Sequence, residues 1–187
     1  MNDHRLKDFI GSFYITGFMG AGKSAIGSRL AQKLQLPFHD LDKYISHREE
    51  ASIPDIFEQH GEQYFREKEK EYLLELTNSF KGVLSLGGGA LQNQHVVDHL
   101  KIHGLLIFIE APLGEVLDRV LGNPKRPIVR NAEGEIKSRE ALKIELETLY
   151  SSRIELYKQA EVKIINSGSD SKEIVVDRLI DKIKKHV

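Results

Sequence analysis

The chain has 187 residues, of which 40% are hydrophobic and 29% charged, and its formal net charge is −1. This balance is typical of a globular domain with a substantial core, and it gives no indication of binding to nucleic acid or to an acidic membrane. The chain has no cysteine, which excludes disulfides, thiol catalysis and cysteine-ligated zinc.

The sequence also indicates where the protein resides. No apolar run approaches the ~20 residues that a membrane-spanning helix needs. The charged stretch Met1–Lys7 is not followed by a long apolar segment, so we expect no secretory signal. We therefore expect one cytoplasmic domain over residues 1–187, with no nucleic-acid or membrane partner.

The first expected elements are a strand over Ser12–Thr16, a glycine loop and a helix that ends near Leu34. The loop, Gly17–Ser24, fits the pattern G-x-x-x-x-G-K-[ST], in which glycines let backbone N–H groups converge on phosphates. Lys23 would reach the outer phosphates, and the Ser24 hydroxyl would ligate Mg²⁺. A glycine turn that binds nothing is the alternative, but the order strand, loop, helix favours the phosphate site.

The second expected strand, residues 37–42, ends in two acids. Asp40 and Asp42 are two residues apart on a segment that we expect to be extended, so both would face the same side. One could hold a metal through water while the other meets a substrate hydroxyl. An ordinary acidic turn is the alternative, and the neighbouring glycine loop makes it the less favoured one.

The middle of the chain should alternate between helices and strands. A triple glycine, Gly87–Gly89, directly follows an apolar strand, which indicates a close approach of the backbone to a ligand or another segment; a flexible turn is the alternative. We expect helices over residues 43–50, from Ser52, over 61–76 and over 94–101, and strands over 83–86 and 105–109.

The last third holds a helix over 112–121, a long loop over 122–137, a helix over 138–158, a strand over 162–165 and a helix over 172–185. Loops this long are usually functional or disordered, and Arg126 within it could close over phosphates. Five strands alternating with helices predict a parallel sheet covered on both faces, with ligands at the carboxyl ends of the strands.

Two further arginines are ambiguous. Arg66 has Glu62 and Glu69 on its own helical face, and Arg153 lies in another charged helix. On pattern alone, ion pairs at the surface are favoured for both.

Taken together, the motifs resemble those of the shikimate kinase family, in family order from about Tyr14 to Ile165. They are Gly17–Ser24, Asp40-x-Asp42, Gly61-Glu62-x-x-Phe65-Arg66-x-x-Glu69, Gly87–Gly89, Arg126-Pro127 and Arg153-x-x-x-Tyr157. The resemblance implies a P-loop kinase fold of three α/β/α layers with a mobile lid at 122–137, and a monomer that phosphorylates shikimate with ATP and Mg²⁺.

The resemblance also implies residue roles. Lys23, Asp42 and Arg126 would be catalytic, and Ser24 with Asp40 would hold the metal. ATP would be bound by Gly20, Ala21, Gly22, Lys23, Ser24, Ala25, Arg119 and Arg126, with Arg119 near the adenine, and shikimate by Asp42, Arg66, Gly88 and Arg153.

The chain departs from the family pattern in its long lid and in the loop over 166–172, where Asp170 stands in place of a frequent arginine. Two alternatives stay open. One is a kinase for another small hydroxy acid such as gluconate, which should lack the paired arginines and the triple glycine. The other is a nucleotide-dependent switch with no acceptor cleft.

Overall fold

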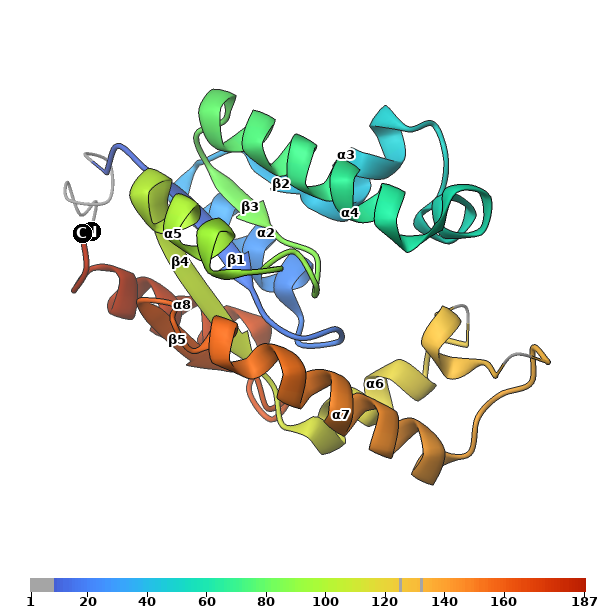
Figure 1. Cartoon of the computed structure of the whole chain (residues 1–187). Coiled ribbons are helices and arrows are strands. Elements are labelled where there is room, and N and C mark those ends of the chain that lie inside the picture. The colour runs from blue at the N-terminus through green and yellow to red at the C-terminus, as the bar shows by residue number, and fades with distance from the viewer. Residues whose placement is uncertain (1–8, 125, 132) are drawn as a thin grey trace.

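The computed structural model describes residues 9–187 except Lys125 and Ala132, so the charged start of the chain lies outside the described residues. Five parallel strands form one sheet in the order β2-β3-β1-β4-β5 (Figure 1). In chain order they are β1 (Ser12–Thr16), β2 (Phe38–Asp40), β3 (Val83–Ser85), β4 (Gly104–Glu110) and β5 (Val162–Ile165). The predicted five-stranded parallel sheet is confirmed.

The described residues form seven α-helices. They are α2 (Lys23–Leu34), α3 (Leu41–Arg48), α4 (Ile53–Ser79), α5 (Gln94–His103), α6 (Leu113–Leu121), α7 (Arg139–Tyr157) and α8 (Lys172–Ile183). Helices α2 and α8 pack together on one face, while α5 and α7 lie on the other (Figure 1). The expected three α/β/α layers are therefore present.

The central strand β1 and its neighbour β4 are buried because helices cover both of their faces. All five residues of β1 are buried, and so are the five apolar residues inside β4. Pairing Tyr14 with Leu106 and Thr16 with Phe108 places these residues on one face, where the Phe108 ring stacks on Tyr157 of α7 with centroids 5.4 Å apart. This core holds the carboxyl ends of the strands in fixed positions.

Short polar residues begin several helices, as their capping preference predicts. Ser52 begins α4 with a capping box, in which its side chain accepts from the Asp55 N–H and the Asp55 carboxylate accepts from the Ser52 N–H. Gly61 interrupts α4 with φ 80° and ψ 173°, so the helix consists of two arms. The sequence predicted both the start at Ser52 and a separate long helix from Gly61.

The prediction that the strand stays extended through Asp42 is wrong. β2 ends at Asp40, which is the N-cap of α3 and accepts a hydrogen bond from the Lys43 N–H at 3.3 Å. Asp42 lies in the first helical turn, where its negative charge is favourable near the positive end of the helix dipole. The two acids are therefore placed by a helix start and not by strand alternation. β3 also ends one residue early, at Ser85.

The long loop over 122–137 has more structure than its composition predicts. It contains a short 3-10 helix, η1 (Pro127–Val129), and an isolated antiparallel bridge between Arg130 and Ile136. Val129 is fully buried, and its carbonyl accepts from the Lys137 N–H at 2.9 Å. The segment thus folds back on itself between α6 and α7, and its expected mobility stays a prediction.

Candidate active site

The glycine loop between β1 and α2 forms one wall of a cavity of about 390 Å³ at the carboxyl ends of the strands. The cavity gathers ten of the residues that the sequence singled out. They are Gly20, Gly22, Lys23, Ser24, Ala25, Asp40, Asp42, Gly88, Arg119 and Arg126. The predicted convergence of the glycine loop, the acidic pair and the triple glycine is therefore present in the fold.

The glycine loop needs its glycines for backbone geometry. Gly20 and Gly22 have φ values of 73° and 94°, a left-handed region that other residues rarely adopt. Lys23 begins α2, and its Nζ donates to the Phe18 carbonyl at 3.1 Å. Burial lowers the pKa of Lys23 to about 8, against the opposing effect of Asp42 and Asp40. The loop thus offers one cation beside a helix N-terminus, an arrangement that suits phosphate.

Ser24 and Asp40 form an oxygen pair at the same edge. The Ser24 hydroxyl donates to Asp40 Oδ2 at 2.5 Å. Within residues 9–187, leaving aside 125 and 132, no group of three or more His, Cys, Asp or Glu residues is placed to hold a metal. Two oxygen ligands fit Mg²⁺, because this ion usually keeps several waters and is bound jointly with substrate phosphates.

Asp42 lines the first cavity beside the triple glycine. Desolvation by the cavity walls and the negative charge of Asp40 raise its pKa to about 6, with Lys23 opposing. A Cβ at Gly87 would lie 2.6 Å from Asp42 Oδ1 and 2.8 Å from Glu69 Oε1. Glycine at this position therefore allows two carboxylates to approach the same backbone. The raised pKa leaves Asp42 able to accept a proton near neutral pH.

A second cavity of about 650 Å³ adjoins the first and shares Met19, Asp42, Gly88 and Arg126 with it. It brings together Arg66 of α4 and Arg153 of α7, two helices that lie on opposite sides of the sheet ends in Figure 1. Its remaining walls are partly apolar and include Ile53, Phe57, Phe65 and Ile128. A small carboxylate-bearing molecule would meet cations from two directions here.

Arg66 does not form only the surface pair that its pattern favoured. Its Nη1 contacts Glu69 Oε2 at 2.6 Å, and Glu69 is only 1% exposed. The Gln92 amide donates to the same Glu69 oxygen at 3.2 Å, while the contact of Arg66 with the exposed Glu62 is longer, at 3.3 Å. The buried carboxylate holds the guanidinium at the cavity wall and leaves part of its fork available.

Arg153 contacts the triple glycine. Its Nη1 donates to the Gly88 carbonyl at 3.0 Å, and the Tyr157 hydroxyl donates to the same oxygen. Burial raises the pKa of Tyr157 to about 12, which keeps this phenol neutral and able to donate. The carbonyl of Gly88 is thus oriented by two donors from α7, one turn apart.

Arg119 and Arg126 approach the glycine loop from α6 and the lid. Arg119 Nη1 donates to the Gly20 carbonyl at 3.0 Å, and its Nη2 lies 3.5 Å from Glu115 Oε2. Arg126 lines both cavities, directly before η1. The lid also brings Lys137 to the second cavity, where it pairs with Glu145 at 2.5 Å.

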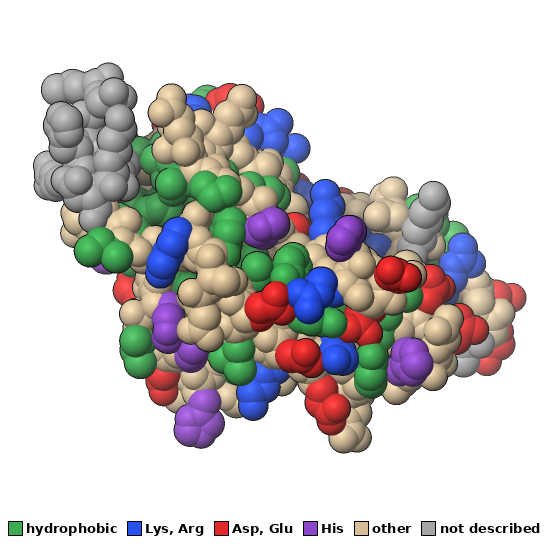
Figure 2. All heavy atoms as spheres, turned by 90° about the horizontal axis from the view of Figure 1, so that it is seen from above, with side chains coloured by type: hydrophobic (Ala, Val, Ile, Leu, Met, Phe, Trp, Pro, Cys, Tyr) green, Lys and Arg blue, Asp and Glu red, His purple; other side chains and the backbone are tan. Residues whose placement is uncertain are grey.

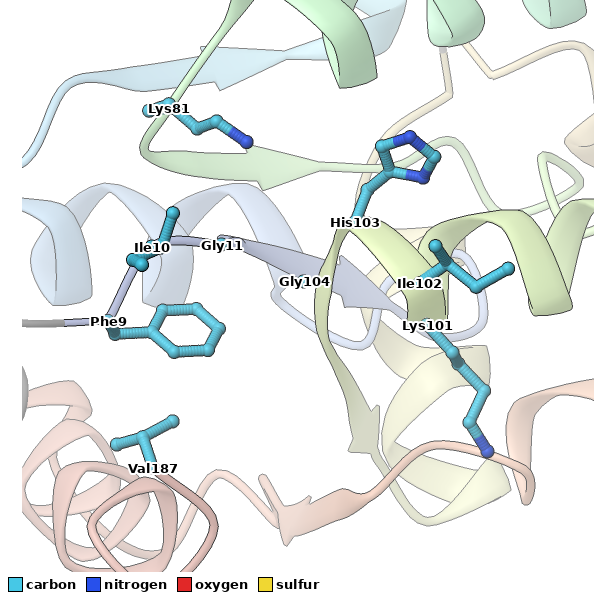
Figure 3. Close-up of a pocket in the computed structure, with 9 residues that line it drawn as sticks. All are labelled: Phe9, Ile10, Gly11, Lys81, Lys101, Ile102, His103, Gly104 and Val187. Atoms are coloured by element: carbon cyan, nitrogen blue, oxygen red, sulfur yellow. The ribbon is translucent and has the colours of Figure 1, made fainter.

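Another cavity, of about 670 Å³, lies at the other end of the sheet (Figure 3). It is lined by Gly11 and Gly104 at the starts of β1 and β4, by Phe9, Ile10, Ile102 and Val187, and by Lys81, Lys101 and His103. None of the residues that the sequence predicted for the site is among them. This cavity and the second one are similar in size, so size alone does not distinguish the two ends of the molecule.

Sequence reasoning missed several contacts. Glu69 was expected only as a surface ion-pair partner of Arg66, and Tyr157 was part of a family motif with no role inferred for it. Gln92 had no signal, and Asn166 was noted only as the start of the loop over 166–172. The Asn166 amide donates to the Ala21 carbonyl at 2.8 Å across 145 positions, and such a pairing is visible only in the fold.

Comparison with known proteins supports one family. The model of the family described as Shikimate kinase matches residues 19–184. A shikimate kinase of Sulfurihydrogenibium sp. is 34% identical over 174 residues, which are 93% of this chain and 98% of the relative.

Two solved structures agree with this comparison. A shikimate kinase from Bacteroides thetaiotaomicron is 29% identical with a TM-score of 0.84, covering 93% of this chain and 98% of the other. A shikimate kinase from Acinetobacter baumannii in complex with shikimate is 28% identical with a TM-score of 0.84, covering 98% of each chain.

Proposed function

Because this chain belongs to the shikimate kinase family, we propose that it transfers the γ-phosphoryl group of ATP to a hydroxyl of shikimate. One observation of the fold carries the proposal. A cavity built on the glycine loop opens into a second one lined by Arg66 and Arg153, and Asp42 lies where they meet. A nucleotide and a carboxylate-bearing acceptor can therefore be held side by side.

In the first cavity, the backbone of residues 20–25 and the ammonium of Lys23 bind the ATP phosphates. Arg126 reaches the transferring group from the lid, and Arg119 lies beside the loop on the side where the adenine binds. Phosphoryl transfer depends mainly on positioning and on charge stabilisation, so these cations lower the barrier chiefly by neutralising negative charge.

Mg²⁺ is part of the proposal, held directly by Ser24 and through water by Asp40, whose oxygens already lie 2.5 Å apart. When bound, this ion neutralises phosphate charge and orients the transferring group. Ser24 would supply one hard oxygen ligand and Asp40 would accept a hydrogen bond from a coordinated water, which leaves the other positions for phosphate oxygens and water.

In the second cavity, Arg66 and Arg153 bind the shikimate carboxylate, since two planar guanidinium groups can each donate a pair of hydrogen bonds to it. Gly88 contributes a backbone contact. Asp42 orients the reacting hydroxyl and accepts its proton as the oxygen bonds to phosphorus and the bond to the departing ADP breaks. The raised pKa of Asp42 suits this transient acceptance.

The proposal extends to the setting of the enzyme. We propose that residues 1–187 act as one domain, monomeric and cytoplasmic, with small molecules rather than nucleic acid or membrane as partners. Charges of both signs are interspersed on the face seen in Figure 2. In the part of the chain that the structure describes, no helix is long and apolar enough to cross a membrane.

One experiment tests the activity directly. ATP consumption should depend on shikimate and on Mg²⁺ when the protein is offered a panel of small hydroxy acids that includes gluconate. Turnover with gluconate but not shikimate would reassign the acceptor. Nucleotide binding without turnover on any acceptor would instead favour the regulatory switch.

A further inference from the structure

Asn166 connects the end of β5 to the glycine loop. It directly follows β5 and is 6% exposed, and its side-chain Nδ2 donates to the Ala21 carbonyl at 2.8 Å. A Cβ placed on Gly22 would lie 2.5 Å from the same Nδ2, so the amide packs directly against the Gly22 backbone. A buried amide in this position interacts with two successive residues of the loop.

The backbone N–H and carbonyl of Asn166 also form hydrogen bonds. Its N–H donates to the Glu110 carbonyl at the end of β4, at 2.7 Å, and its carbonyl accepts from Arg119 Nη2 at 3.4 Å. Arg119 in turn donates to the Gly20 carbonyl at 3.0 Å. Asn166 and Arg119 therefore anchor two successive carbonyls of the loop to the sheet.

Anchoring a carbonyl also directs the next N–H. The described residues contain no cis peptide, and in a trans peptide the carbonyl and the N–H point in opposite directions. With the Ala21 carbonyl directed at Asn166, the Gly22 N–H must point to the other side of the loop. Because Gly22 has φ 94° and tolerates many backbone conformations, this peptide could rotate if the anchor were absent.

We propose that Asn166 is a positioning residue for the nucleotide, which holds the Ala21–Gly22 peptide so that the Gly22 N–H is presented to phosphate. It acts through the loop and touches no reacting atom. The inference rests on the proposed function only in naming ATP as the ligand. Its test therefore measures nucleotide binding directly and does not depend on turnover.

The test compares Asn166→Ala and Asn166→Asp with Asn78→Asp, which makes the same chemical change at an exposed position of α4. ADP affinity is measured by calorimetric titration with Mg²⁺ present, and shikimate affinity is measured in parallel. Losing a buried hydrogen bond that orients the loop should weaken ADP binding on the order of tenfold in Asn166→Ala, with shikimate affinity within twofold of wild type. Asn78→Asp should bind both ligands like wild type.

A pH series separates positioning from a simple loss of packing. At pH 8 the carboxylate of Asn166→Asp cannot donate to Ala21, so ADP binding should be weaker still than in Asn166→Ala. Burial raises the pKa of such a carboxyl, and once protonated it donates an O–H in place of the amide. Relative to wild type, ADP affinity of Asn166→Asp should therefore recover as the pH falls from 8 to 5.5, while Asn166→Ala shows no such recovery.

Two outcomes would overturn the inference. One is unchanged ADP affinity in Asn166→Ala, and the other is a parallel loss of ADP and shikimate affinity that pH does not reverse in Asn166→Asp. If Asn166→Ala fails to fold, Asn166→Asp at low pH still decides. A wild-type protein that binds ADP but does not phosphorylate shikimate would refute the proposed function and leave this inference standing.

Discussion

The two adjoining cavities are built in different ways. The first cavity, which we propose binds the nucleotide, takes six of its twelve lining residues from one contiguous stretch, the glycine loop and the start of α2. The acceptor cavity is assembled from α3, α4, the triple glycine, the lid and α7. A contiguous stretch binds a group common to many ligands, whereas an assembled wall can be matched to the shape and charge of one acceptor. Substitutions in the two cavities should therefore have separable effects.

The largest effect should come from the nucleotide side. Lys23→Met should lower kcat a hundredfold or more while the protein stays folded, because it removes a cation that stabilises charge on the transferring phosphoryl group. Steady-state kinetics measures kcat, and thermal unfolding shows whether the variant is folded. Lys33→Met is the matched control, since it removes an exposed lysine from the last turn of the same helix. Near wild-type kcat in Lys23→Met would contradict the role of the loop.

The acceptor side should respond in affinity for one substrate only. Arg66→Lys and Arg153→Lys keep the charge but lose the planar fork, and each should weaken shikimate binding about tenfold, in keeping with about 1.5–3 kcal/mol for a charged hydrogen bond. ATP affinity should change less than twofold. Lysine is preferable to alanine at position 66, because Arg66→Ala would leave the buried Glu69 carboxylate unpaired.

Calorimetric titration with shikimate measures this effect. Arg48→Lys is the control, since Arg48 forms an exposed pair with Glu75 on the outside of α3. If both arginine variants keep wild-type shikimate affinity, the paired binding of the carboxylate is wrong and the acceptor must be reconsidered.

The pH profile links the two cavities with a smaller effect. The pKa of Asp42 is raised to about 6, so its basic form is lost as the pH falls through that value. The pKa of Lys23 is lowered to about 8, so its charge is lost as the pH rises through that value. The profile of kcat/KM should therefore be bell-shaped, with a threefold to fivefold decrease between pH 7 and 5.5.

Asp42→Asn identifies the acid limb. Its residual activity should no longer decrease between pH 7 and 5.5, while the alkaline limb stays. An acid limb that persists unchanged in Asp42→Asn would assign it to another group.

The smallest effect is expected at the far end of the sheet. Ile102 is 80% exposed and lines the cavity at that end, which contains no predicted site residue. Ile102→Ser should leave kcat and both KM values within twofold of wild type. A selective loss of activity in this variant, with unchanged thermal stability, would show that the two ends of the sheet are coupled.

The sequence predicts the first cavity, which is built largely from one stretch, more fully than the second cavity, which is assembled from several elements. The glycine loop, its strand and its helix were predictable because the relevant spacing is local. The order of the strands in the sheet could be seen only in the structure. The convergence of Arg66 and Arg153 was predicted from the family resemblance alone. Asp42 was placed on a strand because the capping preference of Asp40 was overlooked. Asn166 could not be predicted, since its partner lies 145 positions away and a single asparagine carries no pattern.

Gly61 shapes one wall of the second cavity, the one proposed to bind the acceptor. In an unbroken helix, residues eight positions apart are separated by about 12 Å along the axis. The rings of Phe57 and Phe65, on either side of Gly61, are only 4.7 Å apart because φ 80° and ψ 173° fold one arm of α4 against the other. Both rings line the cavity with Ile53. The dihedral angles of one residue without a side chain thus bring two aromatic rings together on the wall of this cavity.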